Sequence, residues 1–151
     1  MPLVDTLKTV SVRHPAARTH FLQVTLAGSS FKGFLIQARS GGSSNPLGSF
    51  TASGNAQTLY CTTAASAVSH TSGTSKSSIQ VTWVAPSNTN SDIQLRATVV
   101  QSERVFWTGI LSSKLTYNAN DTSDTSPSNS GFQHCAPLYC IFVLMVTILW
   151  I

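Results

Sequence analysis

Histidines and carboxylates are the side chains best suited to acid–base or metal chemistry, and in this sequence they stand apart from one another. The four histidines are His14, His20, His70 and His134, and no two of them show the spacing of a metal-ligand pair. Asp92 and Glu103 are the carboxylates of the central region, and nothing marks them as a paired acid and base. Serine is abundant, but no G-x-S-x-G turn occurs. The sequence therefore predicts no catalytic residue, no metal site and no cofactor.

His70 is the one histidine inside a recognisable phrase, Ala67–His70 (AVSH). Imidazole can serve as a base or a metal ligand near neutral pH. A single histidine at the end of a strand or loop is more often held by a structural hydrogen bond. We interpret His70 in that structural sense.

Three cysteines, Cys61, Cys135 and Cys140, are the disulfide candidates. An odd number always leaves one thiol over within a single chain. Cys135 and Cys140 border an apolar C-terminal stretch, where they could pair with each other or carry palmitate. Their separation does not distinguish these alternatives.

The charge pattern is sparse and mildly basic. Charged residues make up 9% of the chain, and nine Lys and Arg stand against five Asp and Glu. The basic residues are scattered singly, so a phosphate-tracking surface for nucleic acid is not expected. The basic side chains that could gather on one face and bind sulfated glycans or microbial anionic surfaces are Lys32, Arg39, Lys76, Arg96 and Arg104. The alternative is ordinary solubilising charge.

Apolar residues recur at every second position in several short stretches, which is typical of half-buried β-strands. The clearest case is Ile79, Val81 and Trp83, which alternate with polar residues until Pro86 ends the strand. The other predicted strands are residues 19–26, 31–38, 93–99 and 105–110, with a weaker strand and loop in 49–60. Small residues at 27–30 predict that the first two strands form a hairpin. Glycines and Pro46 predict a loop over residues 39–48.

Short strands at intervals of about ten residues predict an all-β fold, an immunoglobulin-like antiparallel β-sandwich. The predicted core contains Phe34, Ile36, Val81, Trp83, Leu95, Ala97 and Val99, and Phe21, Val24 and Leu26 are available for the buried face of the first strand. The domain is expected over residues 19–114, after an atypical N-terminal segment, 1–18. A Ser/Thr/Asn-rich stalk, 115–137, and a hydrophobic membrane tail, 138–151, are expected to follow.

The tail reads LYCIFVLMVTILWI and carries no charge. As a helix it would be about 21 Å long, which is short for a hydrocarbon core of roughly 30 Å. Small residues followed by a spacer and an apolar end are the parts of a glycosylphosphatidylinositol signal. The candidate attachment residues are Ser126, Ser128, Asn129 and Ser130. A lipid anchor is favoured over a membrane helix or a core strand, and the first two place the protein on a membrane.

Two further features bear on the compartment. Asn120 begins an N-x-T acceptor for glycosylation within the stalk. Residues 1–18 contain no apolar stretch of a signal peptide, so we expect either a cytosolic protein or, as favoured, an incomplete start of a secreted one. The expected location is the cell surface or the extracellular space.

Six phrases in one order then narrow the fold to a family. They are Phe31–Arg39 (FKGFLIQAR), Gly48–Phe50 (GSF), Cys61, Ala67–His70 (AVSH), Trp83–Pro86 (WVAP) and Ala97–Val100 with Phe106 and Trp107. In this order they resemble the reeler domain of extracellular animal proteins. Within that family the likeness is to the N-terminal module of ferric-chelate reductases and to small reeler-only invertebrate defence proteins.

The resemblance implies a non-catalytic module for binding or recognition, secreted or tethered to a membrane, with a protein, glycosaminoglycan or microbial surface as ligand. The alternative is a truncated product of a ferric-chelate-reductase-like gene, because neither the DOMON domain nor the cytochrome domain of those enzymes is present. The family position of Cys61 usually pairs with an earlier cysteine, which this sequence lacks. We therefore expect Cys61 to be unpaired and the domain to be less stable than its relatives.

Overall fold

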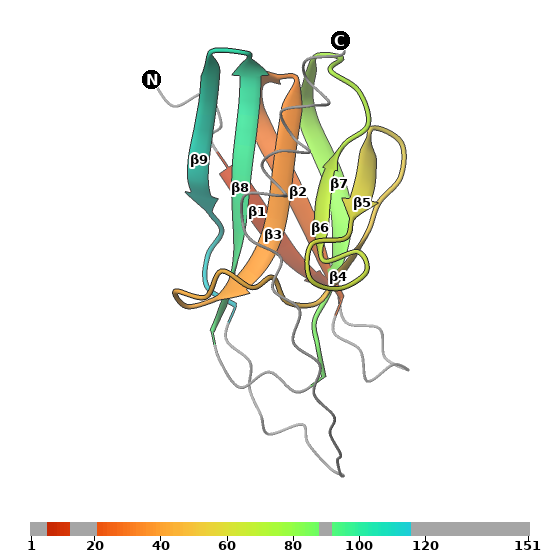
Figure 1. The fold of residues 1–151 in the computed structure, drawn as a ribbon, viewed down its shortest axis with the longest axis vertical. Coiled ribbons are helices and arrows are strands. Elements are labelled where there is room, and N and C mark those ends of the chain that lie inside the picture. The colour runs from red at the N-terminus through yellow and green to blue at the C-terminus, as the bar shows by residue number, and fades with distance from the viewer. Residues whose placement is uncertain (1–5, 13–20, 88–91, 116–151) are drawn as a thin grey trace.

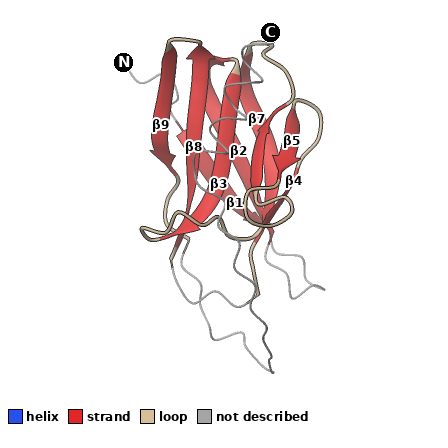
Figure 2. Cartoon of the chain, viewed as in Figure 1, coloured by secondary structure: helices blue, strands red, loops and turns tan. Residues whose placement is uncertain are grey.

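The computed structural model describes residues 6–12, 21–87 and 92–115, and it describes the side chains of the last two ranges. These residues form strands packed as two antiparallel sheets (Figures 1 and 2). One sheet has four strands in the order β1-β2-β7-β4, and the other has five in the order β5-β6-β3-β8-β9. The predicted antiparallel β-sandwich is confirmed.

The strand bounds follow the period-two stretches of the sequence. The four-stranded sheet contains β1 (Thr6–Val12), β2 (Phe21–Phe31), β7 (Lys76–Val84) and β4 (Ser49–Thr51). The five-stranded sheet contains β5 (Ala56–Leu59), β6 (Ala67–His70), β3 (Gly33–Ser40), β8 (Ile93–Ser102) and β9 (Val105–Leu111). Every strand pair is antiparallel, so residues that face one another across a pair lie on the same side of their sheet.

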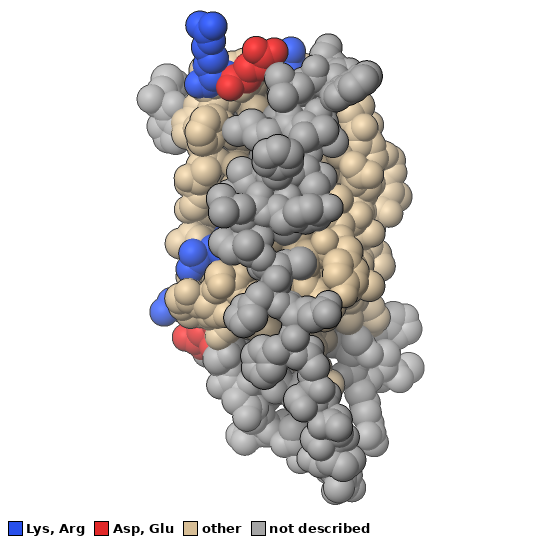
Figure 3. Space-filling model, in the orientation of Figure 1, with Lys and Arg blue, Asp and Glu red and all other residues tan. Residues whose placement is uncertain are grey.

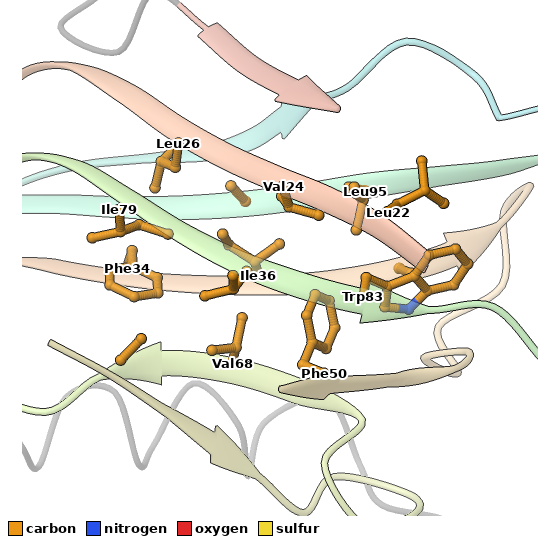
Figure 4. Packing of buried hydrophobic residues seen from close by; sticks show 14 of the residues in the cluster. Leu22, Val24, Leu26, Phe34, Ile36, Phe50, Val68, Ile79, Trp83 and Leu95 are labelled. Carbon is orange, nitrogen blue, oxygen red and sulfur yellow. The ribbon is translucent and has the colours of Figure 1, made fainter. Parts of the chain in front are cut away.

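The core lies between the two sheets (Figure 4). All seven predicted core residues are buried there, so that prediction is confirmed. The four-stranded sheet adds Leu22, Val24, Leu26, Ile79 and Phe50, and the five-stranded sheet adds Val68 and Ile93. In the first of the predicted strands, Leu22 takes the buried position expected for Phe21, which is partly exposed. Alternate residues of a strand share one face, so Leu22, Val24 and Leu26 lie together on the buried face of β2 and Phe21 does not.

The predicted hairpin between residues 19–26 and 31–38 is wrong. β2 pairs with β1 and β7, whereas β3 pairs with β6 and β8, so these consecutive strands belong to different sheets. The small residues expected to turn the chain continue β2 through an irregular stretch between Ala27 and Phe31. The chain then crosses to the other sheet at Lys32. A short loop between two strands therefore does not make them neighbours in a sandwich.

Candidate anion-binding surface

The outer face of the five-stranded sheet is built from the positions of β3 and β8 that alternate with the core. In β3 the core side chains are Phe34, Ile36 and Ala38, which leaves Leu35, Gln37 and Arg39 on the outer face. In β8 the outer positions are Gln94, Arg96, Thr98 and Val100. The outer face is therefore apolar toward the start of β3 and basic toward its end.

The basic half consists of two Gln-x-Arg triplets that run antiparallel to each other. Gln37 is paired with Arg96, and Arg39 is paired with Gln94. Each arginine thus sits opposite a glutamine of the neighbouring strand, and both guanidinium groups share one face. We call Gln37, Arg39, Gln94 and Arg96 the Gln/Arg ladder.

Neutral groups hold the two guanidinium groups. Nε and Nη2 of Arg39 donate to Oε1 of Gln37 at 3.1 and 2.5 Å. Nη2 of Arg96 donates to the carbonyl oxygen of Gly41 at 3.0 Å. The buried Nε of Arg96 has no hydrogen-bond partner among the described residues. Part of the donor capacity of the ladder is therefore unused.

The electrostatics of the ladder favour an anion. Burial lowers the pKa of Arg39, and the positive charge of Arg96 lowers it further. An arginine remains charged at neutral pH despite such a shift. Within the described ranges no salt bridge joins either guanidinium to a carboxylate. A sulfate or carboxylate placed between the two arginines would relieve their repulsion and accept paired hydrogen bonds.

The five basic residues expected to gather on one face are divided by the fold. Lys32 and Arg104 are exposed at the end of the sheet where β2 passes to β3 and β8 turns to β9. Arg39 and Arg96 lie toward the other end, and Figure 3 shows the basic atoms in separate places. Lys76 is buried and belongs to neither group. The arginine pair is therefore the part of this set that can act as a site.

Lys76 is held inside the domain by backbone oxygens. Its Nζ donates to the carbonyl oxygens of Lys32 at 2.6 Å, Ser72 at 3.0 Å and Thr74 at 2.6 Å. Burial lowers the pKa of the ammonium. These contacts tie the crossing between the two sheets to the loop before β7, which is a structural role.

His70 is buried at the end of β6. Its Nδ1 lies 3.2 Å from the backbone nitrogen of Phe34 and 3.2 Å from Oγ of Ser69. Burial lowers the pKa of the imidazole, the backbone carbonyl oxygen of Phe34, 3.3 Å from Nδ1, partly opposes this shift, and the charge of Lys76 lowers the pKa further. The structural interpretation of His70 agrees with these contacts.

The described carboxylates are not a pair. Asp92 precedes β8 and Glu103 follows it, so the ten-residue strand separates them by roughly 30 Å. Within residues 6–12, 21–87 and 92–115, no three His, Cys, Asp or Glu side chains come together as a metal site.

Cys61 is disulfide-bonded, so the expectation that it is unpaired is wrong. It is 2% exposed and is the single cysteine of the described ranges. Nε2 of Gln37 donates to its Sγ at 3.5 Å, and Oγ of Ser66 accepts from its backbone nitrogen at 3.2 Å. The expectation rested on the usual partner of this family position, an earlier cysteine, which this sequence lacks.

The remaining sequence-based sites lie outside the described residues. They are Cys135, Cys140, Asn120, the attachment candidates Ser126, Ser128, Asn129 and Ser130, the histidines His14, His20 and His134, and the tail 138–151. In the part of the chain that is described, no helix has the length and apolar character needed to cross a membrane.

The Gln/Arg ladder was missed as a unit, although its signal is visible in the sequence. Gln37-Ala38-Arg39 and Gln94-Leu95-Arg96 place the same polar residues at alternate positions of two otherwise apolar strands. Only the antiparallel register shows that the two triplets face each other.

Comparison with known proteins then identifies the fold. The Reeler domain family matches residues 9–123, which is most of the chain. The chain belongs to the reeler family. Residues 9–12 of β1 fall within this match, although we predicted an atypical N-terminal segment over residues 1–18.

Two curated relatives represent two kinds of reeler protein. Ferric-chelate reductase 1 of Mus musculus is 44% identical over 94 residues, covering 59% of this chain and 16% of the reductase. Defense protein l(2)34Fc of Drosophila melanogaster is 36% identical over 93 residues, covering 58% of each chain. The chain thus spans less than a fifth of that reductase, and the similarity is confined to the reeler part.

Solved structures support the fold alone. The human F-spondin reeler domain superposes with a TM-score of 0.60 at 23% sequence identity, covering 75% of this chain and 86% of that one. A second structure, the Reelin-N domain of F-spondin, gives a TM-score of 0.58 at 22% identity. The two-sheet sandwich described above is therefore the reeler fold.

Proposed function

We propose that this protein is an extracellular, non-catalytic recognition module that binds sulfated polysaccharide through the Gln/Arg ladder. The observation that carries the proposal is the pair Arg39 and Arg96, two guanidinium groups on one sheet face with no carboxylate partner among the described residues. Sulfate groups accept paired hydrogen bonds from guanidinium groups in the geometry that such a pair offers.

The disulfide at Cys61 supports the extracellular setting. Disulfides persist in oxidising compartments and are rare in the cytosol of ordinary cells. The similarity to a protein named a defense protein supports a recognition role, since microbial surfaces also carry repeated anionic groups.

Heparin affinity chromatography tests the proposal. The double variant Arg39→Gln and Arg96→Gln removes both guanidinium groups, and we expect heparin to release it at a salt concentration well below that for the unmodified protein. The matched control is Lys32→Gln with Arg104→Gln, which removes the same net charge from the other end of the sheet. An equal loss in both variants would mean that net charge alone attracts heparin. Elution of the unmodified protein at physiological salt would reject the proposal.

A second candidate function rests on the 44% identity to ferric-chelate reductase 1. In this alternative the chain is the reeler module of a larger reductase-like product, and the redox machinery lies in other domains. The transcript distinguishes the two: exons for DOMON and cytochrome domains downstream favour the reductase, and a stop codon after the apolar tail favours a reeler-only protein.

A further inference from the structure

The apolar half of the outer sheet face is buried. Leu35 is 7% exposed, Cys61 2%, Ala67 0% and Val100 3%, and Leu59 packs against them. We call these five residues the outer cluster. The outward side of a two-layer sandwich normally faces water and is polar. An apolar cluster on this side therefore needs a cover.

The burial of β3 also indicates a cover on the outer side of the sheet. Its residues from Gly33 to Ala38 are all buried, on the core side and on the outer side alike. A strand buried on both faces lies between two layers. The four-stranded sheet supplies one of these layers, so the outer cluster marks the position of a second.

The disulfide of Cys61 indicates which part of the chain supplies this layer. Cys61 is a member of the outer cluster, and the other cysteines of the sequence are Cys135 and Cys140. We propose that Cys61 is bonded to Cys135 or Cys140 and that the apolar segment 138–151 packs on the outer cluster of the same molecule.

The geometry permits either partner. The Cα atoms of a disulfide lie about 4.4–6.8 Å apart. Cys140 lies within the apolar segment. Cys135 precedes the first residue of that segment by three positions, which span at most about 11 Å. Either bond therefore brings the segment close to Cys61. From Leu115 to Cys135 the chain can extend roughly 70 Å, so the connection does not limit the choice.

The chemistry of the two surfaces is matched. The segment has no charged residue, and the outer cluster consists of apolar side chains and a cysteine. Packing one on the other removes both from water, which stabilises the folded chain. The same apolar residues then cannot enter a lipid bilayer, so this position replaces the membrane anchor expected from the sequence.

Formation of the bridge is a two-electron oxidation, and the oxidant is a disulfide of an oxidoreductase or of glutathione. One cysteine thiolate attacks this disulfide and expels one of its sulfurs as a thiolate. The second cysteine thiolate then attacks the mixed disulfide and expels the other sulfur. The two cysteines lose two protons and two electrons, and the oxidant becomes two thiols.

Peptide mapping of the full, unreduced chain tests the bond. After alkylation of free thiols, trypsin cleaves after Arg39, Lys76 and Lys114, and no Lys or Arg follows Lys114. We expect residues 40–76 to remain joined to residues 115–151. Cleavage after Tyr139 by chymotrypsin then separates Cys135 from Cys140. An alkylated Cys61, or residues 40–76 joined to a second copy of the same peptide, would overturn the proposal.

A variant in the tail tests the packing without altering the sandwich. Leu144→Asp places a charge in the apolar segment, and Ser126→Asp places the same charge in the stalk and serves as the control. We expect Leu144→Asp to increase the fluorescence of an apolar dye severalfold, with the β-sheet circular dichroism unchanged, and Ser126→Asp to have no effect. Equal fluorescence in all three proteins would contradict the packing.

Flotation with phosphatidylcholine vesicles separates this proposal from a membrane anchor. We expect the oxidised, unmodified chain to stay in the aqueous fraction, and its flotation with the vesicles would refute the docked position. Heparin retention should be the same for Leu144→Asp and Ser126→Asp, which carry the same added charge, because the Gln/Arg ladder lies toward the other end of the face. Heparin retention and vesicle flotation therefore test the two proposals separately, although both proposals draw on the disulfide of Cys61.

Discussion

The ammonium of Lys76 donates a hydrogen bond of 2.6 Å to the backbone carbonyl of Lys32. Lys76 begins β7 in the four-stranded sheet, and Lys32 lies between β2 and β3, where the chain passes to the other sheet. Two further carbonyls, of Ser72 and Thr74, accept from the same ammonium. One side chain therefore connects the crossing to the loop that leads into β7.

Replacing this ammonium should destabilise the fold. Lys76→Met keeps much of the apolar side chain but removes the charged donor from the three backbone carbonyls that it contacts. We expect the free energy of unfolding, measured in urea, to fall by about 1.5–3 kcal/mol. The control is Lys32→Met, whose exposed side chain should change it by less than about 0.5 kcal/mol. Equal midpoints for the two variants would show that the carbonyls do not depend on Lys76.

His70 should make stability depend on pH in the acid range. Burial lowers its pKa in the folded state below the ordinary value of 6.5, so the unfolded state binds more protons between these two values. The free energy of unfolding should therefore fall as the pH drops from 6.5 through the folded pKa. Thermal unfolding from about pH 7.5 to about pH 5 measures this slope.

The variant that assigns this slope is His70→Gln. We expect it to have a shallower slope than the unmodified protein, whatever its stability at neutral pH, because the titrating group is gone. Parallel curves for the two proteins would assign the acid sensitivity to other groups.

Gly48 is a position where only glycine fits. Its φ is +69°, and a Cβ there would lie 2.3 Å from the carbonyl oxygen of Val84 and 2.6 Å from Nε1 of Trp83. That indole nitrogen donates to the carbonyl of Leu47 at 3.0 Å, so the clash would also disturb the largest side chain of the core.

Gly48→Ala should therefore cost more stability than Gly54→Ala. Gly54 has a similar φ of +64°, but a Cβ added there would have no atom within 4 Å. Alanine at this position should therefore destabilise only through backbone strain, by about 1–2 kcal/mol. We expect Gly48→Ala to lose about 1–3 kcal/mol more, because the crowded side chains must shift. Denaturant midpoints compare the two, and equal losses would mean that Trp83 moves aside without cost.

The core was predictable from the sequence because burial between two sheets imposes a period of two. Val81 and Trp83 of β7, and Leu95, Ala97 and Val99 of β8, alternate with polar residues and are all buried as expected. Local alternation therefore contained enough information to place these side chains in the core.

Strand partners and the candidate site were not predictable in the same way, because both depend on register between distant segments. The expected hairpin failed when β2 ran on to Phe31 and β3 joined the other sheet. Arg39 and Arg96 are 57 positions apart in the numbering (96 minus 39) and become neighbours only through the pairing of β3 with β8. Cys61 was expected to be unpaired because the usual family partner, an earlier cysteine, is absent, yet it is disulfide-bonded.

The disulfide should contribute a large share of the stability. A bridge from Cys61 to Cys135 or Cys140 closes a loop of at least 75 residues, counted from 61 to 135 inclusive, and a loop of this size stabilises by about 4.5 kcal/mol in the chain-entropy description. Adding a reductant, or making Cys61→Ser, should lower Tm by roughly 15 °C or more. Reductant should have no further effect on Cys61→Ser, which separates loss of this bridge from any general effect of the reagent. A Tm that is the same with and without reductant in the unmodified protein would show that the fold gains nothing from the bridge.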